Sequence, residues 1–345
     1  MLVAKAPLRV NFLGGGSDFP EVFNLQGGAV FGAAINLSVY LSASLIPPFA
    51  NEKFRFTYRK TESVDLASEF EHPVVRQVLS ENSWLPPLNL ATMSDVPGNS
   101  GLGSSSSFTV SLIHLVSYIK GISLPAIDIA KQAIRVEREI LNEAGGWQDQ
   151  LHASNGGLSL YTFDSDGKIS IDSVPGNDPV IGLLNESMLL IPFGGARNSS
   201  ELSNRYRQGL TQGNILQLIR ENADLAITTL QIFKDESLEP NDKINHLGNA
   251  MGRAWEIKLE TSPNANLLEA DLLITKGVAS GALAGKLCGA GESGFVFFLV
   301  LPENKLKVLE GLATSVSFSP SVSIEGSSIN LTHGGPKIGS KTWGG

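Results

Sequence analysis

The first half of the chain alternates apolar segments of strand type with segments of helical periodicity. Strands are indicated where apolar and polar residues alternate, or apolar residues run on, between Gly, Pro, Asn or Asp. We expect strands at residues 4–13, 29–46, 53–58, 88–93, 158–163 and 168–174, the second of them long enough to be interrupted. Helices are expected at residues 73–82, at about 104–120 and after Pro125, where apolar residues recur at helical spacing. Asp164-Ser165-Asp166-Gly167 predicts a hairpin turn.

The second half is mainly helical. A strand at residues 187–193 precedes long periodic segments at 214–234 and 242–258, and strands return at 295–300, 315–324 and 328–331. We find no internal repeat and no long linker, and 345 residues are enough for two cores. The sequence therefore predicts an α+β protein of two lobes, residues 1–182 and 183–345, with the change between them near residues 178–186.

A glycine- and serine-rich segment follows the expected strand at residues 88–93. Glycines allow positive φ and the close approach of a ligand, and the serines stand where a helix begins. The free N–H groups and the dipole of a helix N-terminus favour an anion, so the segment predicts a site for the phosphates of a nucleotide. Its candidate residues are Pro97, Gly98, Gly101, Leu102, Gly103, Ser104, Ser105 and Ser106.

Two common phosphate-binding motifs are excluded by spacing. A Gly-x-Gly-x-x-Gly fingerprint would need glycine where Ser106 stands, and the nearest match to a Walker A loop has Ser280 and Leu287 at positions that require Gly and Ser or Thr. A flexible Gly/Ser linker is the remaining alternative. Apolar residues at helical spacing after residue 107 argue against it.

Charge and composition limit the partners. With 26 Lys and Arg against 34 Asp and Glu, the chain is mildly acidic and has no basic cluster, so we expect no nucleic-acid partner. The single cysteine, Cys288, excludes an internal disulfide and suits a reducing compartment. No leader and no stretch of about twenty apolar residues is evident, so we expect a cytoplasmic protein without a membrane partner. Nothing in the sequence marks the oligomeric state, and a homodimer is compatible with it.

Three segments together resemble the GHMP kinases. The Gly/Ser segment, Pro97-x-x-x-Gly101-Leu102-Gly103-Ser104-Ser105-Ser106, resembles the second motif of that family. Residues 6–19, Ala-Pro-Leu-Arg-Val-Asn-Phe-Leu-Gly-Gly-Gly-Ser-Asp-Phe, resemble the first motif, and residues 286–295 resemble the third. The order fits and the resemblance spans nearly the whole chain. It implies an N-terminal lobe like ribosomal protein S5 domain 2, a ferredoxin-like C-terminal lobe, and ATP with Mg²⁺ as cofactors.

The resemblance also implies catalytic and metal-binding residues. Glu137 and Ser105 match the family's Mg²⁺ ligands, Asp149 matches the aspartate that faces the acceptor hydroxyl, and Arg9 matches its basic neighbour. Each has a plainer alternative. Glu137 could be a solvated helix charge, Asp149 a helix cap and Arg9 a surface arginine paired with a carboxylate.

The first motif bears on the acceptor. Gly15, Gly16, Ser17 and Asp18 form a tight turn whose carboxylate could accept hydrogen bonds from two sugar hydroxyls. Gly-Gly-Gly-Ser-Asp-Phe resembles the form found in bacterial heptose 7-phosphate kinases and fucokinase domains, which phosphorylate an anomeric hydroxyl. For a distal phosphate we expect Arg197, with Arg205, Arg207 and Lys258 in reserve. Gly289 and Gly291 of the third motif complete the substrate set.

Three functions follow from these residues. The first is an ATP-dependent kinase for D-glycero-D-manno-heptose 7-phosphate that forms the 1,7-bisphosphate for polysaccharide precursors. The second is a related kinase for L-fucose or another sugar or sugar phosphate. The third is a catalytically silent relative that binds nucleotide and sugar and signals through a partner. Intact Asp18, Ser105, Glu137 and Asp149 argue against the third.

Overall fold

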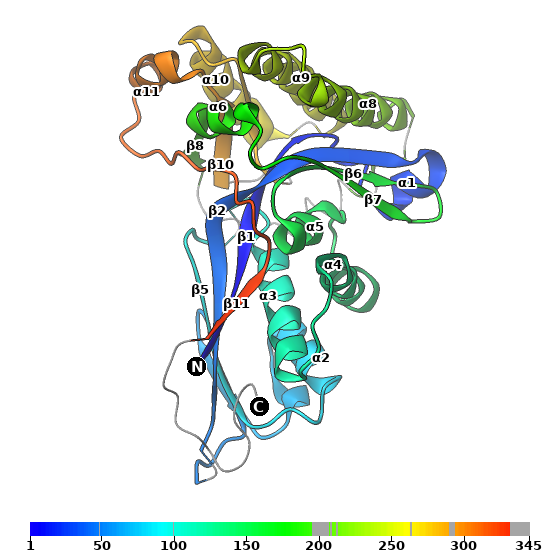
Figure 1. The fold of residues 1–345 in the computed structure, drawn as a ribbon, viewed down its shortest axis with the longest axis vertical. Coiled ribbons are helices and arrows are strands. Elements are labelled where there is room, and N and C mark those ends of the chain that lie inside the picture. The colour runs from blue at the N-terminus through cyan, green and yellow to red at the C-terminus, as the bar shows by residue number, and fades with distance from the viewer. Residues whose placement is uncertain are drawn as a thin grey trace.

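Two sheets organise the protein (Figure 1). The computed structural model describes residues 1–47, 49–98, 100–194, 207, 209–211, 213–262, 264–289 and 294–331. Within these residues an eight-stranded sheet has the order β11-β1-β2-β5-β3-β4, extended by β6 and β7 from β2, and a three-stranded sheet has the order β8-β10-β9. The strands are β1 (Leu2–Leu13), β2 (Gly28–Leu45), β3 (Phe54–Thr57), β4 (Thr61–Val64), β5 (Leu88–Ser94), β6 (Leu158–Phe163), β7 (Ile169–Val174), β8 (Met188–Phe193), β9 (Ala284–Leu287), β10 (Gly294–Leu299) and β11 (Ser328–Leu331).

Helices cover one face of the larger sheet and the top of the molecule. In Figure 1, α2, α3, α4 and α5 lie beside β1 and β2, while α8 and α9 lie across the upper end. Short 3₁₀ turns occur at η1 (Ala67–Glu69) and η3 (Pro302–Asn304), and a π-helical turn at η2 (Arg135–Ile140). The α-helices are α1 (Pro20–Gln26), α2 (Pro73–Ser80), α3 (Ser104–Ile119), α4 (Ala126–Ile134), α5 (Gln148–Asn155), α6 (Pro179–Ser187), α8 (Ile215–Lys234), α9 (Pro240–Thr261), α10 (Ala265–Ala279) and α11 (Lys305–Leu312).

Helix starts follow local capping chemistry. The Asp178 carboxylate accepts from the N–H of Val180 at 2.9 Å, with Pro179 at the first position of α6. The Asn264 side chain accepts from the N–H of Leu267 at 3.0 Å before α10. By contrast, α3 begins after Gly103, whose φ of 81° is left-handed and suits glycine. No side chain caps α3, which leaves its first N–H groups for a ligand.

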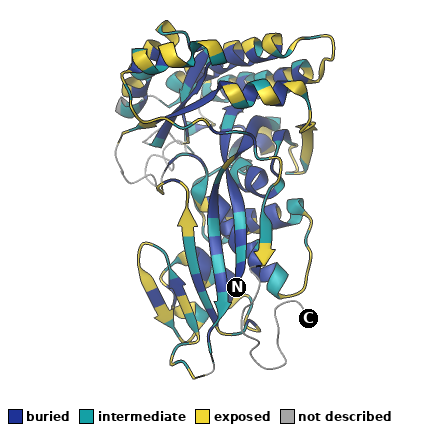
Figure 2. Cartoon of the chain, turned by 60° about the vertical axis from the view of Figure 1, so that its left-hand side comes forward, coloured by how far each residue is buried: buried dark blue, intermediate teal, exposed yellow. Residues whose placement is uncertain are grey.

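One continuous core joins the two sheets. The ring of Phe12 on β1 lies 5.5 Å from that of Phe297 on β10, and Phe31 on β2 lies 5.4 Å from Phe233 on α8. All four side chains are fully buried. Figure 2 shows the middle strands of the larger sheet buried and the outward faces of the upper helices exposed. This shared core fixes the ends of β1 and β9 relative to each other, where the candidate site lies.

The structure confirms most expected elements and corrects several. Residues 29–46 were expected to be interrupted; β2 runs over Gly28–Leu45, and its pairing with β1 shifts register between Ile35 and Ser38. The strand expected at residues 315–324 is wrong, because only isolated bridges Ile35–Val322 and Leu190–Phe318 form there. The chain then returns to the larger sheet, since β11 pairs with β1 from Leu2–Leu331 to Lys5–Ser328. Residues 328–331 therefore extend the larger sheet instead of the smaller one.

Candidate active site

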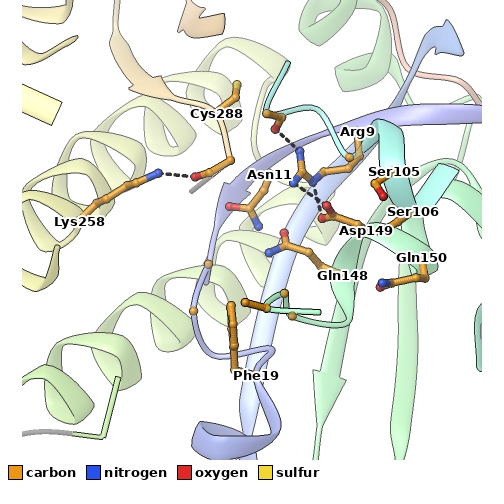
Figure 3. Close-up of a pocket in the computed structure, with 18 of the residues that line it drawn as sticks. Arg9, Asn11, Phe19, Ser105, Ser106, Gln148, Asp149, Gln150, Lys258 and Cys288 are labelled. Carbon is orange, nitrogen blue, oxygen red and sulfur yellow. Dashed lines mark hydrogen bonds and ion pairs between the residues drawn. The ribbon is translucent and has the colours of Figure 1, made fainter. Parts of the chain in front are cut away.

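A cavity of about 640 Å³ lies where the two sheets meet (Figure 3). Its walls come from the end of β1, the Gly/Ser loop and the start of α3, the π-helical turn η2, and the loop leading into α5. Helices α8 and α9 and the end of β9 complete it. The three motifs, far apart in the sequence, therefore contribute to a single cavity.

In the described part of the chain, no helix is long and apolar enough to cross a membrane.

Arg9 and Asp149 form a two-point ion pair in this cavity. Nε and Nη2 of Arg9 donate to Oδ1 and Oδ2 of Asp149 at 2.8 and 2.9 Å, and Nη1 donates to the carbonyl of Gly101 at 2.6 Å. The Arg9 side chain is 8% exposed and that of Asp149 25%. A planar guanidinium holds a carboxylate in one orientation in this geometry. The arginine thus sets the position of the carboxylate and ties it to the Gly/Ser loop, and neither of the plainer alternatives describes this pair.

The second and third motifs pack backbone against backbone. A Cβ on Gly101 would lie 2.6 Å from the carbonyl oxygen of Cys288, and one on Gly289 would lie 2.7 Å from the Cα of Gly101. On Gly294 it would lie 2.1 Å from the carbonyl oxygen of Ser100. All three glycines have positive φ. These glycines are therefore required by the contact between the two loops as well as by their own turns.

Glu137 is a buried carboxylate at the cavity wall. Burial raises its pKa to about 7. Its Oε2 accepts from Oγ of Ser106 at 2.8 Å and from Nε2 of Gln150. Oε1 is buried without a hydrogen-bond partner in the described residues. The π-helical turn η2 carries Glu137 into this position, and such turns are frequent at functional sites.

Glu137 fits a divalent cation better than a structural role. An unpartnered carboxylate oxygen beside serine hydroxyls is a suitable ligand for Mg²⁺, which takes one or two carboxylates and completes its shell with phosphates and water. No group of three or more His, Cys, Asp or Glu able to hold a metal occurs among the described residues. Ser105 was predicted to hold Mg²⁺ together with Glu137, and the neighbouring Ser106 donates a hydrogen bond to the Glu137 carboxylate. Ser105 also lines the cavity and is exposed.

Asp18 and Ser17 lie behind the cavity wall, which differs from the expected contact with sugar hydroxyls. The Asp18 carboxylate is fully buried and accepts from the N–H groups of Gly16 and Gln148, each at 3.2 Å. Burial raises its pKa, with the nearby charge of Asp149 adding to the effect. Ser17 is also fully buried, and its hydroxyl donates to the carbonyls of Gly14 and Ala29. In this structure both residues shape the first-motif turn.

Some of the other predicted site residues line the cavity, and the rest lie outside it or outside the described residues. Gly15, Gly16, Gly101, Gly103, Ser104 and Gly289 line the cavity. Pro97 and Gly98 are exposed outside it, and Leu102 is buried in the core. Arg197, Arg205 and Gly291 lie outside the described residues. Arg207 donates to Glu21 at 2.5 Å and to Asn142 at 3.2 Å, so its charge is already paired.

Several cavity residues were missed from the sequence. Asn222 on α8 accepts from the N–H of Gly14 at 2.9 Å and donates to the carbonyl of Gly15 at 3.3 Å, so it fixes the first-motif turn. Asn11, Gln148 and Gln150 also reach the wall. So does Lys286. Asn11 stands two residues after Arg9 on β1 and so shares its face, a signal that could have been used. Lys286 opens the third motif, which was a usable signal as well, whereas Asn222 gave none.

The cavity also holds two half-buried lysines, Lys258 on α9 and Lys286 on β9. Burial lowers the pKa of Lys258 to about 8. Burial, aided by the positive charge of Lys258, lowers the pKa of Lys286 to about 7. With Arg9 they make this wall cationic.

Comparison with known proteins identifies relatives over most of the chain. D-glycero-alpha-D-manno-heptose 7-phosphate kinase of Campylobacter jejuni is 26% identical over 319 residues, which cover 89% of this chain and 92% of that protein. The bifunctional fucokinase/GDP-fucose pyrophosphorylase of Arabidopsis thaliana is 24% identical over 88% of this chain, which spans only 30% of that longer protein. A crystal structure of a D-glycero-D-manno-heptose 1-phosphate kinase from Bacteroides thetaiotaomicron superposes with a TM-score of 0.76, covering 97% of this chain and 100% of that one at 21% identity.

The family model covers the second of the three motifs. Residues 51–157, which include the Gly/Ser loop, Glu137 and Asp149, match the GHMP kinases N terminal domain. The superposition extends the same mixed α+β fold over nearly the whole chain. The resemblance to the GHMP kinases inferred from three short segments is thereby confirmed.

Proposed function

We propose that this protein is an ATP-dependent sugar kinase that phosphorylates the anomeric hydroxyl of D-glycero-D-manno-heptose 7-phosphate, giving the 1,7-bisphosphate. The observation that carries the proposal is the Arg9–Asp149 pair held beside an uncapped helix N-terminus in one cavity. Similarity over 89% of the chain to a heptose 7-phosphate kinase supports the acceptor. Because ATP and sugar phosphates are cytoplasmic metabolites, the proposed reaction places the protein in the cytoplasm.

The start of α3 would hold the nucleotide phosphates. The first N–H groups of a helix have no intrahelical acceptor, and the helix dipole favours negative charge there. Gly101 and Gly103 leave room for phosphate oxygens to approach the backbone, and the hydroxyls of Ser104 and Ser105 add donors. Positioning and charge stabilisation of this kind supply most of the catalysis in phosphoryl transfer.

Glu137, with Ser105 or Ser106, would hold Mg²⁺ against those phosphates. The ion would neutralise charge that develops on the transferred phosphoryl group. The buried Oε1 of Glu137 lacks a partner, and Ser106 and Gln150 orient the carboxylate through Oε2. Charging this buried group is costly unless a cation arrives, so the carboxylate is suited to a metal that binds with the nucleotide.

Asp149 would orient the acceptor hydroxyl and take up its proton. Both carboxylate oxygens accept from Arg9, and the side chain remains one quarter exposed toward the cavity. Arg9 fixes the carboxylate and leaves its outward side to the sugar. The proton moves to Asp149 as the bond to phosphorus forms, which is general-base catalysis by a positioned carboxylate.

For the acceptor sugar, one other candidate has support from the comparisons. Similarity to a fucokinase domain over 88% of the chain favours L-fucose as the second candidate. Both reactions use the same catalytic residues, and they differ in whether the cavity must bind a distal phosphate. A silent regulator is disfavoured because Asp149, Arg9 and Glu137 all stand in one cavity.

The test is ADP release with ATP and Mg²⁺ against D-glycero-D-manno-heptose 7-phosphate, mannose, L-fucose and galactose in parallel. Turnover of the heptose phosphate alone is the expected result. Turnover of L-fucose or another neutral sugar would keep the kinase and replace the acceptor. No turnover of any sugar, in a protein that still binds ATP, would overturn the proposed activity.

A further inference from the structure

Lys258 and Lys286 stand on the cavity wall without a carboxylate partner among the described residues. Nζ of Lys258 donates to the carbonyls of Leu287 and Gly289 at 3.2 and 2.6 Å. Nζ of Lys286 donates to Oδ1 of Asn11 and the carbonyl of Phe12 at 3.1 and 3.0 Å. Each ammonium has three N–H donors, so each of these two lysines keeps one donor beyond those contacts.

Two unpaired ammonium groups beside Arg9 are costly in the absence of an anion. The pKa of each lysine is lowered, first by burial, and the positive charge of Arg9 contributes for both. The Arg9 charge is already matched by Asp149. Half-buried cations held on a cavity wall at this cost indicate a site where a ligand supplies the negative charge. A purely structural role, in which the lysines only join neighbouring carbonyls, is the alternative.

Lys258 and the serines of the Gly/Ser loop lie on opposite sides of the Arg9–Asp149 pair in the view of Figure 3. In Figure 3, Lys258 extends from α9 on the left, Ser105 and Ser106 lie on the right, and Arg9 and Asp149 stand between them. In phosphoryl transfer the attacking and leaving oxygens lie roughly in line on opposite sides of phosphorus. A nucleotide bound at Ser104–Ser106 therefore leaves the opposite side to the acceptor. Lys286 contacts β1 at Asn11 and Phe12, just before the first-motif turn.

We propose that Lys258 and Lys286 form the subsite that binds the phosphate group carried by the sugar acceptor. The inference rests on the proposed function, because it assigns residues to a phosphorylated acceptor of the same active site. It gives these lysines a role in choosing between a sugar phosphate and a neutral sugar. A phosphate dianion would accept one hydrogen bond from each ammonium while the contacts to Asn11 and to the Gly289 carbonyl remain.

The test compares Lys258→Met and Lys286→Met with the wild type and with Lys276→Met, which removes an exposed lysine of α10. Michaelis constants are measured for heptose 7-phosphate, for the same heptose without phosphate, and for ATP. We expect each cavity variant to raise the constant for the phosphorylated sugar at least tenfold, while the constants for the neutral heptose and for ATP change less than about threefold. Lys276→Met should behave as wild type.

Other outcomes overturn the subsite in distinct ways. Equal increases for both heptoses would mean that the lysines only support the cavity wall. An increase for ATP alone would assign them to the donor phosphate. Lys258→Arg and Lys286→Arg keep the charge, so they should retain part of the preference for the phosphorylated sugar if a Met variant fails to fold. If the two arginine variants lose the preference for the phosphorylated sugar while they still bind ATP, that result counts against the proposal.

A failure of the proposed function can be separated from a failure of the subsite. If the wild type turns over no sugar, binding of mannose 6-phosphate and of mannose is measured by calorimetry without nucleotide. Preference for the phosphorylated sugar in the wild type and its loss in both Met variants would support the subsite alone. Equal binding of the two sugars by the wild type would overturn it.

Discussion

The carboxylate of Asp18 occupies the space that a side chain at position 146 would need. A Cβ on Gly146 would lie 1.7 Å from Oδ2 of Asp18, and that same oxygen accepts from the N–H of Gln148 at 3.2 Å. The carbonyl of Asp18 accepts from the N–H of Trp147 at 3.1 Å. The first motif is thus joined directly to the loop that presents Asp149. This relationship explains why the Asp18 carboxylate is buried against the loop, although its turn was expected to face the sugar.

Gly146→Ala should damage the active site, whereas Gly145→Ala should not. The added methyl group at position 146 must displace Asp18 or the loop, and a displacement near 1 Å at a reacting group can cost about 100-fold in rate. A Cβ at Gly145 meets nothing within 4 Å, which makes it a matched control. Comparing kcat for the two variants tests the contact. Similar rates would show that Asp18 does not position the catalytic loop.

Removing the charge of Asp149 should separate catalysis from nucleotide binding. In Asp149→Asn the proton acceptor is lost, and we expect kcat to fall roughly 10²–10⁴-fold while the dissociation constant for ATP stays within about threefold. Arg9→Met should lower kcat and also weaken ATP binding, because Arg9 holds the Gly101 carbonyl of the Gly/Ser loop. Stopped-flow ATP binding and steady-state rates check both. Near-normal turnover by Asp149→Asn would remove its catalytic assignment.

Glu137 should make the metal-free protein less stable as pH rises. Burial raises its pKa from 4.5 to about 7, so between these values the folded protein holds a proton that the unfolded chain has released. Stability therefore falls as pH rises from about 4.5 to 7, by an amount on the order of 3 kcal/mol when the whole difference is realised. Glu137→Gln removes this titration, so its Tm relative to the wild type should be higher at pH 8 than at pH 5.

Magnesium should reverse that difference for the wild type alone. At pH 8, MgATP supplies the cation that the charged Glu137 lacks, so thermal unfolding of the wild type should shift upward more than that of Glu137→Gln. ATP with EDTA provides the control without a divalent ion. Equal shifts in both proteins would mean that Glu137 does not hold the metal.

Much of the fold could be predicted from local sequence patterns, whereas the candidate site could be predicted only in part. Strand periodicity located β1, β2, β5 and β6, and the hairpin signal at Asp164–Gly167 correctly joined β6 to β7. The resemblance of the motifs predicted that Arg9, Glu137 and Asp149 act together, and all three line one cavity. The position of Asp18 was not predictable from its motif. Whether a carboxylate in a turn points into a cavity or toward a neighbouring loop depends on Gly146 and Gln148, about 130 residues away.

Long-range packing also decided the other differences. The segment at residues 315–324 has a strand-like composition, but its neighbours offer only single bridges at Val322 and Phe318. Ser106 donates to Glu137 because the packing of the buried face of α3 sets the rotation of that helix about its axis. Lys286 reaches the cavity because β9, a strand that was not expected from the sequence, pairs with β10.

The contact between the second and third motifs gives a further prediction, on the glycines. Gly101→Ala would place a methyl group 2.6 Å from the Cys288 carbonyl at a φ of +74°, so both the close approach and the backbone conformation oppose it. We expect a loss of stability of about 1–3 kcal/mol and a rise of at least tenfold in the Michaelis constant for ATP, since Arg9 is bonded to the same residue. Gly98→Ala, where a Cβ meets nothing within 4 Å, is the control from the same loop and should leave both unchanged. If the two alanine variants bind ATP equally well, the third motif does not set the shape of the phosphate loop, and the two glycine segments act independently.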